Sequence, residues 1–300
     1  MVSRLIRASV LVALAASPAG AQSIDDGVLL PTKVLSTGLM YSHDSWTEYW
    51  EGTLKRTNGN IGTLTTQSAM VVAGYGLTSR LTVLTTLPYV WTRASAGTLE
   101  GMKGIQDVTV AAKFRALASD RTGLSAIVVA AAAVPASNYT PDLMPMSIGT
   151  GGVRASGRLT VAYQPPAPWF LSASGAYTFC NNVRLDRSSY YTNGQLYLTN
   201  QVAMPNVSEY EITVGLRHGR WELPVTLVQQ HTLGGGDIRR QDMPFVSDRM
   251  DFTRLGGELR YALSRPGNLS LRFGAAQVLD GRNVGQSTTI TSGLMYAFHL

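Results

Sequence analysis

The sequence is poor in cysteine and in charge. Its single cysteine, Cys180, excludes a disulfide framework within the chain. Charged residues make up only 15% of the 300 residues, whereas about 25% is typical of a soluble domain. Glycine is abundant at 30 residues, and the 13 tyrosines outnumber the 7 phenylalanines. This composition suits a β-protein whose strands are apolar on one face only.

Long hydrophobic runs are also missing beyond the N-terminus. The longest apolar run after residue 21 covers residues 124–136, and it contains Pro135. A helix needs about 20 apolar residues to span a membrane. This run is therefore too short to be a spanning helix.

The first 21 residues have the layout of a secretory signal peptide. Arg4 and Arg7 precede an apolar stretch at 8–16, and residues 19–21 (AGA) match an Ala-x-Ala cleavage site. We expect residues 1–21 to be removed and residues 22–300 to form the mature protein, beginning at Gln22. An exported chain without a spanning helix is either soluble in the periplasm or outside the cell, or crosses a membrane as strands.

Alternating hydrophobicity over segments of about ten residues is the main structural signal. In residues 107–116 (DVTVAAKFRA) every second residue from Val108 to Ala116 is apolar, and Asp107, Lys113 and Arg115 lie at intervening positions. Residues 152–163 and 209–218 repeat the pattern. Such alternation puts apolar and polar side chains on opposite faces of a strand. It fits a membrane barrel, and it also fits a soluble sandwich with its charged face outward.

The lengths of the connections decide between these two folds. The pattern predicts twelve strands, at 33–45, 63–76, 80–92, 105–117, 123–136, 152–164, 169–180, 206–218, 221–232, 250–263, 268–280 and 285–300. Five links are tight, at 76–79, 118–122, 165–168, 219–220 and 264–267. The links between them are longer, at 46–62, 93–104, 137–151, 181–205 and 233–249, with one short exception at 281–284. Short turns at one end and long loops at the other are typical of an outer-membrane β-barrel, so we predict an all-β, transmembrane antiparallel barrel of about 12 strands.

The last strand supports a closed barrel. Residues 293–300 (GLMYAFHL) alternate up to the terminal Leu300, although terminal residues usually fray. We expect the strand at 285–300 to pair with the strand at 33–45, which removes the free edges of the sheet. Tyr296 and Phe298 also resemble the C-terminal signal that the barrel-insertion machinery recognises. Partners are therefore expected to include that machinery and outer-membrane lipid.

Aromatic residues gather near the predicted strand ends. Amphipathic rings favour the headgroup region of a membrane and form girdles around a barrel. The residues placed in such girdles are Tyr89, Trp91, Tyr163, Trp169, Tyr177, Phe179, Trp221, Tyr261 and Tyr296. Soluble core aromatics would lie in the middle of strands instead.

Two stretches of the sequence stand out, AGYGLTSRLTVLTTLPYVW at 73–91 and GIQDVTVAAKFR at 104–115. Both resemble the outer-membrane transporter-like family named after the meta-pathway of phenol degradation. The second is similar to the family's Gly-x-x-Asp strand, with Lys113 and Phe114 following Asp107. The resemblance implies a barrel that takes up aromatic compounds or other hydrophobic carbon sources.

One pair of residues is compatible with an enzymatic function. His43 and Ser45 share one face of a strand near the long-loop rim, as a His/Ser pair does in outer-membrane phospholipases. A triad also needs a group that orients the histidine and donors for an oxyanion. Asn58 and Asn60 lie in the next loop, but no wider phospholipase sequence surrounds them. We therefore expect no catalytic residues, and we keep a lipid hydrolase, or a structural or adhesive barrel, as the alternatives.

Metal, phosphate and nucleic-acid sites are not expected either. The histidines His43, His218, His231 and His299 are scattered without a close His/Cys partner. The glycine run at 234–236 is not followed by a helix, as a phosphate-binding loop requires. The sequence therefore predicts no metal, no cofactor and no nucleic-acid partner.

Charges on the polar faces of the strands are the candidate functional residues. Twelve are expected to face the lumen: Asp107, Lys113, Arg115, Arg154, Arg158, Glu209, Glu211, Arg217, Arg254, Glu258, Arg260 and Arg272. Eight of these are basic and four acidic, so an open pore would favour anions. The same residues could instead form an internal salt-bridge network that fills the barrel. The predicted function is an outer-membrane channel for small solutes that are aromatic or hydrophobic and, if the pore is open, preferably anionic.

Overall fold

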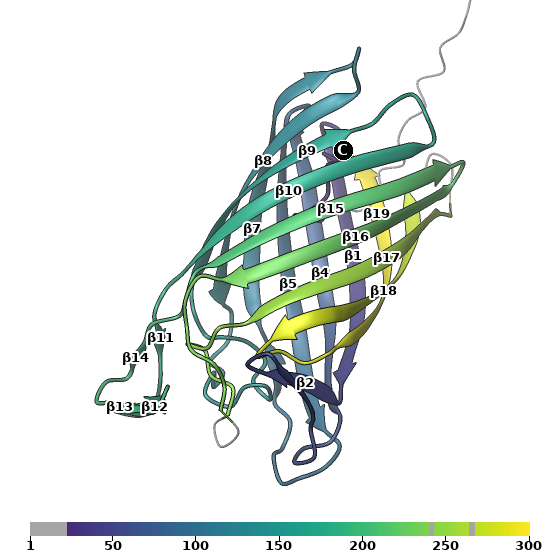
Figure 1. The fold of residues 1–300 in the computed structure, drawn as a ribbon. Coiled ribbons are helices and arrows are strands. Elements are labelled where there is room, and N and C mark those ends of the chain that lie inside the picture. The colour runs from purple at the N-terminus through teal and green to yellow at the C-terminus, as the bar shows by residue number, and fades with distance from the viewer. Residues whose placement is uncertain (1–22, 240–242, 264–267) are drawn as a thin grey trace, which may run out of the picture.

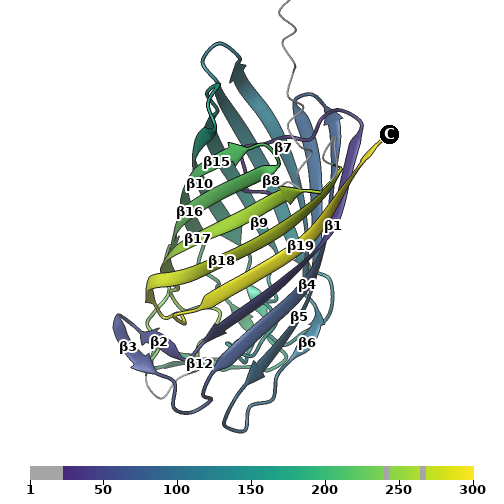
Figure 2. The same cartoon turned by 90° about the vertical axis from the view of Figure 1, so that its right-hand side faces the viewer.

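The computed structural model describes residues 23–239, 243–263 and 268–300. Twelve long antiparallel strands form a closed barrel (Figures 1 and 2). The strands are β1 (Val34–Trp46), β4 (Leu64–Thr78), β5 (Leu81–Ala94), β7 (Asp107–Ser119), β8 (Leu124–Pro135), β9 (Arg154–Tyr163), β10 (Trp169–Cys180), β15 (Val207–His218), β16 (Trp221–Thr232), β17 (Asp251–Ala262), β18 (Leu269–Arg282) and β19 (Thr288–His299). Each strand pairs with its neighbours in sequence, and the prediction of twelve strands is confirmed. The expected signal peptide lies outside the described residues.

The first and last strands close the barrel. β1 pairs with β19 in a register that sets Val34 opposite His299, and it pairs with β4 on its other side. The backbone N–H of Leu300 donates to the carbonyl of Lys33 at 2.9 Å. The predicted closure between the two ends of the chain is therefore confirmed, and it explains why the alternation continues to the last residue.

Apart from the short link at 283–287, the connections are sorted by length between the two ends of the barrel (Figure 1). Gly123 and Gly219 lie in tight turns and adopt positive φ angles of 71° and 59°, which only glycine adopts without strain. The opposite end carries short strands that the sequence patterns did not predict. These are β2 (Glu48–Glu51), β3 (Leu54–Thr57), β6 (Lys103–Ile105), β11 (Val183–Arg184), β12 (Tyr190–Thr192), β13 (Gln195–Tyr197) and β14 (Gln201–Val202).

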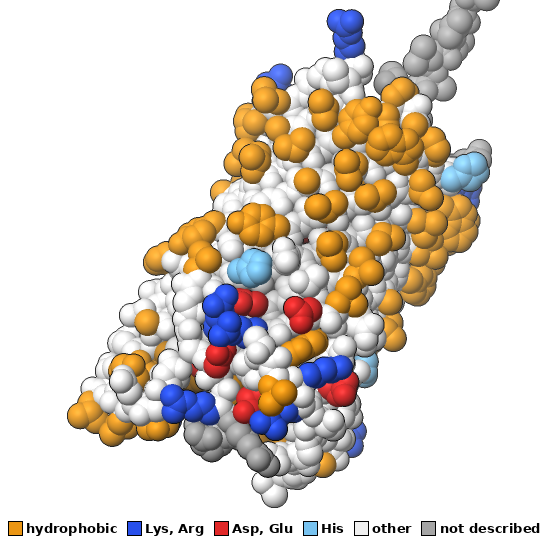
Figure 3. Space-filling model, viewed as in Figure 1, with side chains coloured by type: hydrophobic (Ala, Val, Ile, Leu, Met, Phe, Trp, Pro, Cys, Tyr) orange, Lys and Arg blue, Asp and Glu red, His pale blue; other side chains and the backbone are white. Residues whose placement is uncertain are grey.

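The two faces of the wall differ as the alternation predicts. On β7, Phe114 points outward with 47% of its surface exposed, whereas the adjacent Lys113 is fully buried inside the barrel. Apolar side chains cover the outer surface, and charged ones gather toward the long-loop end (Figure 3). Such an apolar outer band matches the hydrocarbon layer of a membrane. Within the described residues, no helix is long and apolar enough to cross a membrane.

Aromatic pairs border the apolar band. Near the short turns, the rings of Tyr163 and Trp169 lie 5.4 Å apart and those of Trp221 and Tyr261 lie 4.2 Å apart. Toward the long loops, the ring centroids of Trp91 and Tyr89 lie 6.1 Å apart. These positions agree with the predicted interfacial girdles.

The long loops pack against one another and against the barrel wall. Buried residues from two of them form an apolar cluster, which consists of Val183, Leu185, Tyr190, Val202, Phe245 and Val246. The hydroxyl of Thr92 on β5 donates to the carbonyl of Met146 at 2.6 Å. This contact holds the 136–153 loop against the barrel wall.

An ion pair fixes Asp237, which follows β16, to the wall. Both carboxylate oxygens of Asp237 accept hydrogen bonds from Arg282 at 2.7 Å, and Oδ1 also accepts one from the amide of Asn283 at 2.9 Å. The bonds from Arg282 stabilise the charged carboxylate and lower the pKa of Asp237 to about 2.

Candidate functional site in the barrel lumen

The structure places all twelve charged candidates on the inner face of the wall. On each strand, the residues next to them in sequence are the ones that point outward, as Phe114, Leu159, Tyr210 and Leu216 do. The candidates lie on β7, β9, β15, β17 and β18. Ten of them form ion pairs that divide into four groups. Arg115 and Arg254 form no ion pair within the described part of the chain.

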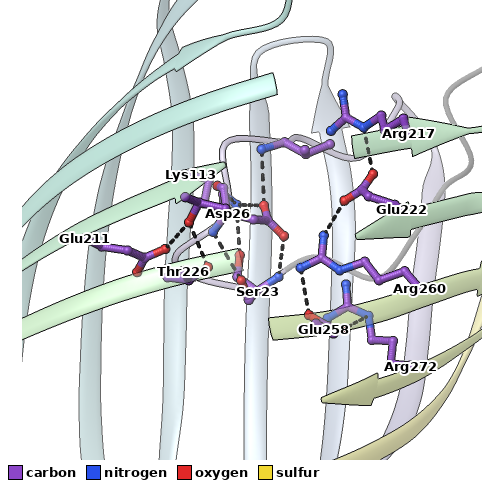
Figure 4. A network of polar contacts seen from close by, with 12 residues as sticks. Ser23, Asp26, Lys113, Glu211, Arg217, Glu222, Thr226, Glu258, Arg260 and Arg272 are labelled. Atoms are coloured by element: carbon purple, nitrogen blue, oxygen red, sulfur yellow. Dashed lines mark hydrogen bonds and ion pairs between the residues drawn. The ribbon is translucent and has the colours of Figure 1, made fainter. Parts of the chain in front are cut away.

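The first group joins the barrel wall to residues 23–31, which we call the N-terminal segment. This segment runs inside the barrel before β1 begins. The Nζ atom of Lys113 donates to the backbone carbonyls of Ser23 and Asp26 at 2.8 Å, and it donates to Oδ1 of Asp26 at 2.6 Å (Figure 4). The segment therefore supplies every acceptor that this fully buried ammonium contacts among the described residues.

The second group surrounds Arg158 with three carboxylates. Its Nη2 atom lies 3.0 Å from Asp25 of the N-terminal segment and contacts Glu209, and its Nη1 atom lies 3.6 Å from Glu211. Oxygen atoms of these acids come within 4.8 Å of one another, which is close enough to share a cation. The guanidinium of Arg158 already provides that positive charge, so this group is an ion-pair cluster.

The third group is a chain of alternating charges along β15 to β18 (Figure 4). Glu222 accepts from Arg217 at 2.7 Å and from Arg260 at 2.8 Å, and Glu258 links Arg260 to Arg272. The guanidinium of Arg217 also lies 4.1 Å from the ring centroid of Phe170, a favourable cation–π distance. These contacts fix side chains that would otherwise move freely in the lumen.

The fourth group ties a long loop to the lumen. Asp107 pairs with Arg154 at 2.7 Å, and it also accepts a hydrogen bond from the hydroxyl of Tyr139 in the 136–153 loop. Burial and the neighbouring carboxylate raise the pKa of Tyr139 well above its usual range. The phenol therefore stays protonated and continues to donate at any physiological pH.

The lumen is closer to neutral than the sequence indicates. Four acids that the sequence count omitted also face it: Asp25 and Asp26 of the N-terminal segment, Asp44 on β1 and Glu222 on β16. Among the described residues, acids and bases in the lumen are then equal, at eight each, so the predicted surplus of four positive charges is absent there while the segment is in place. Without the segment, the wall keeps six acids against eight bases.

Two cavities lie inside the barrel, and Asp25 lines both of them. The first, of about 300 Å³, is bounded by Arg217, Glu222, Arg254 and Arg260. The second, of about 330 Å³, has a polar side and an apolar side. Arg154, Arg158 and Glu209 form the polar side, and Val129, Ala131, Cys180 and Met204 form the apolar side.

The alternative site at His43 and Ser45 lacks the contacts of a catalytic triad. Among the described residues, no hydrogen bond joins His43 to Ser45. The side-chain oxygen of Asn58 accepts instead from the backbone N–H of Ile61 at 3.3 Å, which is a local loop contact. In the part of the chain that the structure describes, no group therefore orients His43.

A comparison with protein-family models matches residues 56–292 to the family described as "Putative MetA-pathway of phenol degradation". The chain belongs to this family. The match covers more than half of the chain and includes both stretches on which the resemblance was noted. A comparison with curated protein sequences found no match.

Solved structures with the same fold are outer-membrane barrels. The COG4313 outer membrane channel from Pseudomonas putida F1 is similar with a TM-score of 0.73 and 14% identity, over 92% of this chain and 100% of that one. The NanC porin gives a TM-score of 0.50 at 7% identity, over 86% and 98% of the two chains. The transport unit of the autotransporter AIDA-I from Escherichia coli gives 0.50 at 10% identity, over 93% and 94%. At these identities the likeness establishes the fold, an outer-membrane β-barrel.

Proposed function

We propose that this barrel is an outer-membrane channel that lets small solutes enter the cell, and that its two luminal cavities lie on the solute's path. The observation that carries the proposal is the second cavity, because it combines an apolar side with the guanidinium groups of Arg154 and Arg158. Ligand sites are commonly apolar with a few placed polar groups. Such a lining suits an aromatic or otherwise hydrophobic solute that also carries a polar group.

The family and the fold support the same proposal. The family's description refers to phenol degradation, and two of the similar barrels are a channel and a porin. Outer-membrane lipid and the barrel-insertion machinery are the other partners we propose, because a barrel of this kind is inserted from the periplasm and faces lipid on its outer surface.

Liposome swelling tests the proposal. Purified protein is refolded into vesicles, and swelling is recorded with isosmotic benzoate, benzyl alcohol, phenol and a sugar. We expect the aromatic solutes to enter faster than the sugar. Equal rates in vesicles with and without protein, for all four solutes, would contradict a channel.

The lipid hydrolase remains the second candidate, because His43 and Ser45 share the outward face of β1 near the lipid. Ser45→Ala would abolish lipid hydrolysis by such an enzyme and leave a channel unchanged. We expect the variant to swell liposomes at the wild-type rate, with no hydrolysis of phospholipid by either protein.

A further inference from the structure

The barrel wall is shaped to receive the N-terminal segment. Leu29 packs in a buried cluster with Leu84, Ala111, Ile127 and Val129 of the wall. The backbone N–H of Leu30 donates to Oγ1 of the fully buried Thr82 at 3.0 Å.

Small residues on the wall make room for the segment. A Cβ atom at Gly76 would collide with the carbonyl oxygen of Pro31, and one at Gly27 of the segment would lie 2.8 Å from Cβ of Ala162. Real Cβ atoms do not approach so closely, so glycine is needed where segment and wall meet. The segment therefore occupies a fitted site inside the lumen.

Lys113 depends on the segment for the negative charge that balances its ammonium group. The ammonium has three protons to donate, and its three acceptors are Ser23 and Asp26 carbonyls and the Asp26 carboxylate. No other acid pairs with Lys113 among the described residues. If the segment left, an unpaired cation would face a narrow lumen beside an apolar patch of Leu84 and Ile127.

Arg158 differs from Lys113 in this respect. When Asp25 leaves, Arg158 keeps Glu209 and Glu211 of the wall. An incoming anion would meet those two carboxylates at Arg158 but none at Lys113. The free positive charge created by release of the segment is therefore at Lys113, where it would attract anions.

We propose that Lys113 and the apolar wall beside it form a binding site for a small apolar carboxylate, and that the N-terminal segment occupies this site as a plug until the solute's carboxylate replaces that of Asp26. The proposal rests on the channel function proposed above and adds its solute class and its regulation. The segment imitates such a solute, because it presents the carboxylate of Asp26 to Lys113 and the side chain of Leu29 to the apolar wall. Release of the segment also removes Asp25, which lines both cavities, and joins them into one path.

The accessibility of the natural Cys180 can be used to measure the replacement of the segment by a solute, without an introduced cysteine. It is the chain's single cysteine, it is buried, and it lines the second cavity beside Ile24 and Asp25 of the segment. The rate at which a charged methanethiosulfonate reagent modifies Cys180 is measured in refolded protein with increasing benzoate. Benzyl alcohol, which is similar in size but uncharged, is the matched probe.

We expect benzoate to raise the modification rate at least fivefold in a saturable manner, and benzyl alcohol to leave it unchanged. Asp26→Asn should raise the rate without benzoate, because a neutral amide holds Lys113 less firmly. Asp120→Asn, the same chemical change in an exposed short turn, should behave as the wild type. The proposal would be overturned if the modification rate of Cys180 in the wild type did not change with benzoate, or if it rose equally with benzyl alcohol.

A disulfide that locks the segment provides the second test. A Cβ atom at position 27 would lie 4.0 Å from Cβ of Ser172, within the range of about 3.5–4.5 Å found in disulfides. The variant carries Gly27→Cys and Ser172→Cys. It also carries Ala162→Gly, which removes the close contact with the new Cβ atom at position 27, and Cys180→Ser, which removes the natural cysteine. We expect the cysteines to join on oxidation, and failure to join in a folded barrel would contradict the placement of the segment.

Benzoate flux into liposomes should be at least tenfold lower in the oxidised protein than after reduction. Equal flux in the two states would refute the plug. If no variant passes any solute, the proposed channel function is contradicted. The response of Cys180 to benzoate still decides whether a carboxylate displaces the segment.

Discussion

A charge on the lipid face should destabilise the barrel according to its depth in the membrane. Ile212 lies at the middle of β15, pairs with Ala173 and Leu227 on the two neighbouring strands, and is 53% exposed on the outer face. Leu216 lies on the same face of the same strand and is equally exposed at 55%. Four residues span about 13 Å along a strand, which is about 10 Å in depth at a tilt near 40°.

That difference in depth sets the expected magnitudes. An arginine at the bilayer midplane costs about 2–4 kcal/mol, and one near the interface costs about 0–1 kcal/mol. Ile212→Arg should therefore lower the free energy of unfolding by at least about 1 kcal/mol more than Leu216→Arg does. Guanidinium titrations in lipid vesicles, followed by tryptophan fluorescence and by gel mobility of the folded form, measure both variants. Equal losses, or a larger loss for Leu216→Arg, would refute the assigned position of the barrel in the membrane.

Three other outcomes are expected. Protein extracted from the membrane should begin at Gln22, as N-terminal sequencing would establish; a retained Met1 would contradict the signal peptide. Because Arg282 depresses the pKa of Asp237 to about 2 from an ordinary value of 3.8, the stability contributed by their contact is present above about pH 4 and is lost as the pH falls toward 2. The difference in melting temperature between wild type and Asp237→Asn should shrink over that range, and a constant difference would argue against the ion pair. Replacing Arg154 and Arg158 together with glutamine leaves six acids against six bases on the open wall, so the reversal potential under a salt gradient should shift toward cations; no shift would mean that these arginines do not line the conducting path.

The strands could be predicted from the sequence because their signal is local. Alternation within β7, β9 and β15 shows which side chains face the lumen without knowledge of their partners. The closure between β1 and β19 also followed, since a last strand with an apolar face needs a partner. The parity of β16 would equally have placed Glu222 in the lumen, because Leu223, Val225 and Leu227 face outward.

The N-terminal segment could not be predicted in the same way. Asp26 is 87 residues away from Lys113 in sequence, and residues 23–31 show no alternation that would mark them as part of the barrel. The site forms only when the closed wall brings Lys113, Thr82 and Ala162 around one short stretch of chain. The short strands β11 and β14 escaped prediction for a similar reason, because they are held by pairing across many residues.

Planar-bilayer recordings of wild-type protein and of Asp26→Asn test most directly whether this barrel is a channel. We predict discrete conductance steps for both proteins, with the open state more frequent in Asp26→Asn and a modest preference for anions, as expected for a wall with eight bases and six acids. A membrane current that stays at baseline for both proteins, in preparations where gel mobility demonstrates a folded barrel, would contradict a channel.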